Sequence, residues 1–105
     1  MDISDIISAI LTDNIRITNH AYEEALNDDL TFDEILYSSV FGHIIEEYPE
    51  DTPFPSCLVF GRTFSDDPVH TVWAYDDVRQ ISTLVTVYRP DPGMWTDWRD
   101  RRDQI

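Results

Sequence analysis

Lysine is absent from the 105 residues, and all seven basic side chains are arginines set against 21 acids. The formal net charge of −14 opposes indiscriminate binding to nucleic acid, because phosphates are also negative. Such repulsion is screened beyond about 8 Å at physiological ionic strength, so several converging arginines could still form a local anion site. The acidity also suits a solubilising surface, adaptation to salt, or imitation of nucleic acid.

The chain has one cysteine and only three glycines. The single Cys57 excludes an internal disulfide and is typical of a reducing compartment, and its apolar run CLVF predicts a buried thiol. No glycine-rich phosphate loop is present. No apolar run reaches the roughly 20 residues that cross a bilayer, and the acidic start MDISDIISAIL does not resemble a signal peptide. We therefore expect a cytoplasmic protein with no membrane contact.

Enough apolar material remains for one domain over residues 1–105, because 42% of the residues are hydrophobic and 12% are aromatic. In the first half, apolar residues recur at helical spacing. Three amphipathic helices are expected. The first contains the apolar residues between 3 and 11 and has Asp2 or Ser4 as its N-cap. The second has Asn19 as its N-cap, and the third begins with a capping box formed by Thr31 and Glu34. Gly42 is expected to end the third helix.

The second half changes to short runs rich in β-branched and aromatic residues, which predict strands. Extended segments or strands are expected over 14–18, 43–48, 56–64, 69–75 and 81–89. Short links between the last three favour an antiparallel meander, while the proline-rich 49–55 is a rigid connector. Residues 96–105 are expected as a terminal helix or a frayed tail. The elements predict an α+β fold in which N-terminal helices pack on one face of an antiparallel β-sheet.

Metal and cysteine chemistry find little support in the sequence. His20, His43, Cys57 and His70 could be metal ligands, but their spacings match no zinc motif. Cys57 also lies in no local motif of a cysteine nucleophile. We therefore expect no metal ion and no cofactor.

Cleavage of RNA fits the remaining side chains better. The reaction needs a base for the 2′-hydroxyl, an acid for the leaving oxygen and cations around the phosphate. Imidazole suits the proton steps because its ordinary pKa is about 6.5, and the planar guanidinium suits the phosphate. Alternation along the strands permits a catalytic site of His70, Arg62 and either Tyr88 or Arg89, with His20 at a helix start as a further candidate.

Each candidate also has a structural interpretation that the sequence leaves open. His20 could bond locally at its helix start, and His70 could be a core or edge histidine of an apolar strand. Arg62 and Arg89 could pair with nearby surface acids. The cluster WRDRR (98–102) could be a solvated helix face or a contact for nucleic acid. The ribonuclease hypothesis requires His70, Arg62 and Arg89 to share one cleft.

Four stretches between Ile17 and Trp95 carry further motifs: ITNHAYEEALNDDLTFDEI, GHIIEEYPEDTPFPSCLVFGRT, PVHTVWAYD and LVTVYRPDPGMW. Together they resemble a bacterial and archaeal family of domains of unknown function that is similar to RelE- and BrnT-type toxins of toxin–antitoxin pairs. The resemblance implies the small α+β fold of microbial ribonucleases, RNA as the substrate and an antitoxin protein as the partner.

The resemblance also assigns individual residues. His20 matches the histidine of the family motif I-T-x-H-A, and His70 matches the histidine of P-x-H-V-V. Arg62 stands where the family often has a basic residue, and Tyr88 heads the motif Y-x-P-D.

Two arginines of the family motif E-R-M-x-E-R are missing, and Glu24 and Asp28 stand in their places. Each replacement reverses a charge, which would weaken any phosphate binding there. Three hypotheses therefore remain. The chain is an RNA-cleaving toxin-like domain, active or attenuated; a catalytically inactive binding module of the same fold; or an acidic nucleic-acid mimic or salt-adapted domain.

Overall fold

The computed structural model of the chain describes residues 1–102. Within them the elements are α1 (Ile3–Leu11), β1 (Ile15–Ile17), α2 (Asn19–Asn27), α3 (Phe32–Val40), β2 (His43–Tyr48), β3 (Ser56–Arg62), β4 (Pro68–Asp76), β5 (Ile81–Tyr88), β6 (Trp95–Thr96) and β7 (Asp100–Arg101). The predicted helices and strands of the first 89 residues all form. None of the helices in this part of the chain is long and apolar enough to cross a membrane.

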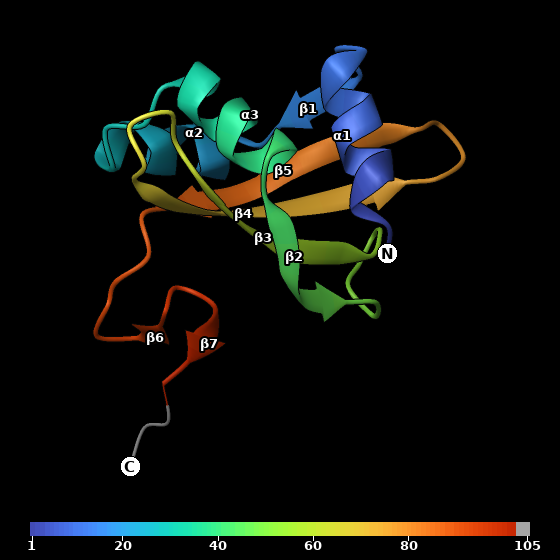
Figure 1. Cartoon of the computed structure of the whole chain (residues 1–105). Helices are drawn as coiled ribbons and strands as arrows, with labels where there is room; N and C mark the ends of the chain where they lie inside the picture. The colour runs from blue at the N-terminus through green and yellow to red at the C-terminus, as the bar shows by residue number, and fades with distance from the viewer. Residues whose placement is uncertain (103–105) are drawn as a thin grey trace.

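The main sheet has the strand order β1-β5-β4-β3-β2. Strands β3 to β5 form the predicted antiparallel meander. At its edges β2 pairs antiparallel with β3 and β1 pairs in parallel with β5, and the sequence predicted neither of these two pairings. The three helices lie on one side of this sheet and the small β6–β7 hairpin lies on the other (Figure 1). The α+β prediction, with N-terminal helices packed on the sheet, is therefore confirmed.

Side-chain caps explain where the first two helices begin. Asp2, one of the two predicted caps of α1, accepts a hydrogen bond from the backbone N–H of Ser4 at 2.9 Å. The cap of α2 is Thr18 and not Asn19, because the Thr18 hydroxyl accepts from the N–H of Ala21 at 3.0 Å. A cap satisfies an N–H two or three positions into the helix, and the extended backbone of Thr18 provides that geometry.

The start and end of α3 follow the sequence prediction. Thr31 and Glu34 form the capping box, in which each side chain accepts from the other residue's backbone N–H at 3.2 and 2.9 Å. Gly42 follows the C-cap of this helix. A Cβ at Gly42 would lie 2.6 Å from the carbonyl oxygens of Ser38 and Phe60, so the close approach of helix and strand requires glycine there.

The core lies between the helices and the sheet. Trp73 is its largest fully buried side chain, and its indole N–H donates to the hydroxyls of Ser39 and Thr71, each at 3.1 Å. Cys57 is buried as predicted, and burial raises the pKa of its thiol to about 12. The other buried apolar side chains of the cluster are Ile6, Ile10, Ala21, Leu30, Ile35, Val59, Val69, Leu84 and Val87.

The end of the chain differs from the prediction. Residues 96–105 were expected as a helix or frayed tail, but β6 and β7 form a hairpin; residues 103–105 lie outside the described part. The turn of this hairpin holds Asp97 and Trp98 at φ of 52° and 62°, which a helix does not allow. Trp95 is only 4% exposed. The hairpin therefore gains its order from packing on the sheet and not from a local apolar period.

Candidate functional site

His70 lies in a row of side chains on the sheet face opposite the helices. Pairing of β3, β4 and β5 places Phe60, His70 and Tyr88 side by side. The imidazole is 0% exposed, with Nε2 at 2.6 Å from the carbonyl oxygen of Trp98 and Nδ1 at 3.1 Å from the Tyr88 hydroxyl. Because a carbonyl oxygen only accepts, Nε2 carries the proton, and Nδ1 of the neutral ring accepts from Tyr88.

The residues after β5 close the space above His70. We call residues 90–102 the C-terminal segment. Within it, the Trp95 ring meets the His70 ring edge-on at a centroid distance of 4.5 Å, and Arg101 binds the Glu46 carboxylate at 2.9 and 3.1 Å. Burial lowers the pKa of His70, so the imidazole is neutral at pH 7. With both nitrogens paired, His70 cannot meet a substrate while the segment is in place.

A second imidazole lies beside a hollow between the strands β2 and β3 and the C-terminal end of α3, which we call the arginine hollow. Its volume is about 280 Å³, and it is lined by Tyr37, Phe41, His43, Phe60, Arg62, Thr63, Asp66 and Arg99. Two guanidinium groups stand over the Phe60 ring, with their central carbons 5.5 Å (Arg62) and 5.0 Å (Arg99) from the ring centroid. Two of the seven arginines thus converge on one aromatic ring.

His43 is held at this hollow by its pairing with Phe60 across β2 and β3. Arg99 donates its Nε–H to Nε2 of His43 at 3.2 Å, so Nε2 is the unprotonated nitrogen. Partial burial first, and the Arg99 charge second, lower the pKa of His43. The hollow therefore combines two fixed positive charges with a neutral imidazole. It can bind an anion, and His43 can accept a proton once Arg99 releases Nε2.

Three exposed aromatic side chains adjoin the hollow, and we call them the aromatic patch: Tyr37, Phe41 and Phe64. They are 40%, 72% and 62% exposed. The Tyr37 ring lies 4.8 Å from Phe41 and 5.5 Å from Phe64, between centroids. Clustered, exposed aromatic rings are uncommon on a protein surface without a ligand or partner.

His20 lies apart from both histidines of the sheet face. It is exposed on α2, with Nε2 at 2.9 Å from the carboxylate of Glu24. Glu24 also accepts a hydrogen bond from the Thr86 hydroxyl of β5. Glu24 therefore joins α2 to the sheet.

Arg89 is bound near the same helix. Its backbone N–H and its Nε–H donate to the side chain and the carbonyl of Asp28, each at 2.8 Å, and its guanidinium lies 3.7 Å from Asp67. Asp28, the C-cap of α2, therefore also holds this helix to the residue that follows β5. Arg89 does not line the arginine hollow.

The structure therefore divides the predicted site residues among three places. His70 and Tyr88 meet beneath the C-terminal segment, Arg62 lines the arginine hollow, and His20 and Arg89 lie against acids of α2. His70, Arg62 and Arg89 share no cleft, so the joint site that the ribonuclease hypothesis requires does not form, and a catalytic role for any one of them stays a prediction. Over residues 1–102, no group of three or more His, Cys, Asp or Glu side chains is placed to hold a metal ion.

His43 and Arg99 supply much of the chemistry of the hollow, and neither was among the predicted site residues. His43 was considered only as a metal ligand, and Arg99 only as part of the cluster WRDRR. A signal for His43 was present, because a hairpin between 43–48 and 56–64 brings it to the strand that carries Arg62. Arg99 had no such signal, because its position depends on the packing of the C-terminal segment.

Comparison with known proteins adds a family. A search of curated proteins and a search of solved structures found no match. Residues 17–89 match the family model described as Domain of unknown function (DUF4258). The match includes His43, Arg62 and His70 and ends before the C-terminal segment that contributes Arg99.

The family match confirms the predicted resemblance at the level of a domain of unknown function, while the likeness to RelE- and BrnT-type toxins stays a prediction. Because the match covers well over half of the chain, the protein belongs to the DUF4258 family.

Proposed function

We propose that the protein binds single-stranded RNA through the arginine hollow and the aromatic patch. The observation that carries the proposal is the convergence of Arg62 and Arg99 on Phe60 beside exposed aromatic rings. Guanidinium groups bind phosphate oxygens through paired N–H donors, and aromatic rings stack on unpaired bases. Bases in a duplex are already stacked and paired, so this arrangement favours a single strand.

The proposal is compatible with the charge of −14 because the contact is local. Screening over about 8 Å separates the hollow from most of the acids at physiological ionic strength. Asp66 is the nearby exception, since its carboxylate lies 3.8 Å from Nε of Arg62. This pair is exposed and therefore weak, so a phosphate group can replace the carboxylate as the partner of Arg62.

The test is fluorescence polarisation with a labelled RNA of about 12 nucleotides and mixed sequence. Arg62→Ala and Arg99→Ala should each weaken binding about tenfold, which corresponds to losing one charge-assisted contact of about 1.4 kcal/mol. Phe41→Ala should weaken it at least about fivefold through lost stacking, for which about 1–3 kcal/mol per base is typical. Arg79→Ala is the matched control, because Arg79 is an exposed arginine on the β4–β5 turn.

Two results would reject RNA binding at this place. One is wild-type protein that shows no binding at millimolar concentration. The other is a loss in Arg79→Ala equal to the loss in Arg99→Ala, since binding would then respond only to total charge.

A second candidate function is RNA cleavage in the same hollow, as the resemblance to toxins implies. The neutral imidazole of His43 beside two guanidinium groups favours it. Arg99 would turn from Nε2 of His43 to the phosphate, and that nitrogen would take the 2′-hydroxyl proton. The 2′-oxygen would attack the adjacent phosphorus, and the 5′-oxygen would leave with a proton from water, so that a 2′,3′-cyclic phosphate remains. Denaturing gels of the same RNA distinguish the two functions. Products that vanish in His43→Gln and persist in His70→Gln support cleavage, whereas intact RNA leaves binding alone.

A further inference from the structure

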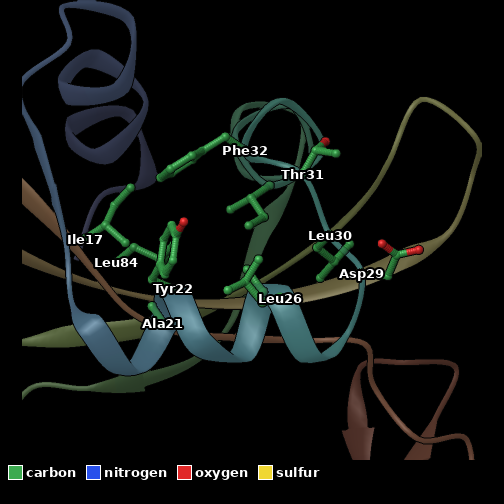
Figure 2. Close-up of a pocket in the computed structure, with 11 residues that line it drawn as sticks. Ile17, Ala21, Tyr22, Leu26, Asp29, Leu30, Thr31, Phe32 and Leu84 are labelled. Atoms are coloured by element: carbon green, nitrogen blue, oxygen red, sulfur yellow. The ribbon is translucent and has the colours of Figure 1, made fainter.

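An apolar groove runs between α2 and the N-terminal part of α3, on the helix side of the sheet. Its volume is about 320 Å³. Figure 2 shows Tyr22 and Leu26 rising from α2 toward Thr31 and Phe32 at the start of α3. The floor is closed by side chains of the core: Ala21, Leu30, Ile35 and Leu84.

The rim of this groove exposes large apolar side chains. Tyr22 is 55% exposed, Leu26 is 64% exposed and Phe32 is 44% exposed. Tyr22 and Leu26 are four residues apart, so they stand one turn apart on the same face of α2. Apolar rims above a preformed groove are typical of surfaces that receive the apolar face of a helix.

Charge around the groove specifies the class of partner. Asp29 lines the groove, and the exposed Glu23 and Asp33 are chain neighbours of its lining residues Tyr22 and Phe32; over residues 1–102 none of the three carboxylates forms an ion pair. No lysine or arginine occurs from residue 17 to residue 61, and Arg89 reaches this place only through the backbone carbonyl oxygen of Asp29, at 3.2 Å. RNA is excluded from such a rim by its phosphates. A second copy of the chain is disfavoured as well, because it would bring another net charge of −14.

We propose that the groove between α2 and α3 binds a basic amphipathic helix of a partner protein. Apolar side chains of that helix would enter the groove beside Leu26 and Phe32. Lysine or arginine residues on its flanks would face the unpaired carboxylates of the rim. Burial of apolar area supplies affinity, and the charges select a basic helix over an acidic one.

The probe is a synthetic helical peptide of about 18 residues with leucine at helical spacing and lysine elsewhere. Any cationic peptide is attracted to so acidic a protein, so two further peptides are needed. In one, serine replaces every leucine, and in the other, glutamate replaces every lysine. Titration calorimetry at about 0.15 M salt should detect binding of the leucine–lysine peptide, and of the other two only at least about tenfold more weakly.

Variants of the protein locate the binding. Leu26→Asp should weaken binding of the leucine–lysine peptide at least about tenfold, although it adds a negative charge that favours a cation. Leu11→Asp is the matched control, because Leu11 is a 71% exposed leucine on α1 and the substitution adds the same charge. Arg99→Ala should leave peptide binding unchanged, which separates this proposal from the one for RNA.

Three outcomes would overturn the proposal. The serine–lysine peptide would bind as tightly as the leucine–lysine peptide, or Leu26→Asp and Leu11→Asp would behave alike. In the third outcome the protein would be a dimer in light scattering that Leu26→Asp dissociates, which would assign the groove to a second copy.

Discussion

His70 illustrates how a residue with catalytic chemistry can be committed to structure. Its ring is fully buried between Phe60, Tyr88 and Trp95, and both nitrogens have partners. The two hydrogen bonds require the neutral tautomer with a proton on Nε2. A protonated ring could no longer accept from Tyr88, and it would have to be desolvated as a cation.

This burial makes the stability of the protein depend on pH. The pKa of His70 is lower in the folded chain than its ordinary value of 6.5, so below that pH the unfolded state binds a proton that the folded state does not. The stabilising contribution is complete above pH 6.5 and is lost as pH falls toward the folded pKa. We expect the melting temperature to fall between about pH 7 and about pH 5, and to fall less in His70→Gln.

Thermal melts at closely spaced pH values check this expectation. The pKa of His43 is lowered too, so His43→Gln measures the part contributed by the more exposed imidazole. Identical pH profiles for wild type and His70→Gln would show that His70 does not titrate with unfolding.

At the scale of elements, the close packing of α3 on β3 requires that Gly61 has no side chain. A Cβ at Gly61 would lie 1.8 Å from the carbonyl oxygen of Ser38 in α3. Since backbone atoms cannot move aside cheaply, Gly61→Ala should destabilise the fold by about 3 kcal/mol or more. Gly93→Ala is the control, because its Cβ would only meet the flexible side chain of Asp91 at 3.2 Å. Urea unfolding of both variants measures the difference, and equal free energies would contradict the packing of α3 on β3.

The acidic helix α2 is joined to β5 by two carboxylates, one within the helix and one at its C-cap. Asp28 accepts the backbone N–H of Arg89, and Glu24 accepts the hydroxyl of Thr86. Asp28→Arg should therefore cost about 1.5–3 kcal/mol, because it removes a charged acceptor and places a second guanidinium beside Arg89. Glu23→Arg, on the exposed side of the same helix, controls for the change of charge. A gain in stability for Asp28→Arg would show that this carboxylate is not a structural partner.

At the scale of the whole molecule, the charge of −14 produces repulsion among surface acids. Salt screens this repulsion in the compact state more than in the expanded unfolded chain. We expect the melting temperature to rise between about 0.05 M and about 1 M salt. A variant with Glu23→Gln, Glu50→Gln and Asp77→Asn should show a smaller rise, because each position is exposed and unpaired over residues 1–102. A flat profile for the wild type would argue against surface repulsion as a limit on stability.

The elements with local signals were predictable from the sequence. Capping side chains, a helical apolar period and short links between β-rich runs identify α1 to α3 and the meander of β3 to β5. These signals act within a few residues, and so they can be found before the fold is known. The cap of α2 was predicted at Asn19 and lies at Thr18. Local signals could not distinguish the two, because both residue types are good caps and only the backbone geometry decides between them.

The candidate site was predictable only in part. Arg62 was expected to contact phosphate, and the structure places it in the hollow proposed for RNA. Sequence alternation alone could not separate Arg62 from Arg89, because the faces of two strands are related only through their register. Sequence alternation also could not show that His70 is buried. Trp95 and Trp98, which cover it, belong to a segment whose sequence has neither a helical nor a strand periodicity.

The sequence by itself determined the α+β class, the order of the elements, the buried thiol and the acidity of the surface, because each depends on composition or on spacing within one element. Tertiary structure alone decided which cations converge, which histidine is covered and which acids are structural partners. Those outcomes depend on contacts between residues far apart in the chain, such as Arg99 with His43 and Arg89 with Asp28. Contacts of that kind form only when the strands have paired in register and the C-terminal segment has packed against the sheet.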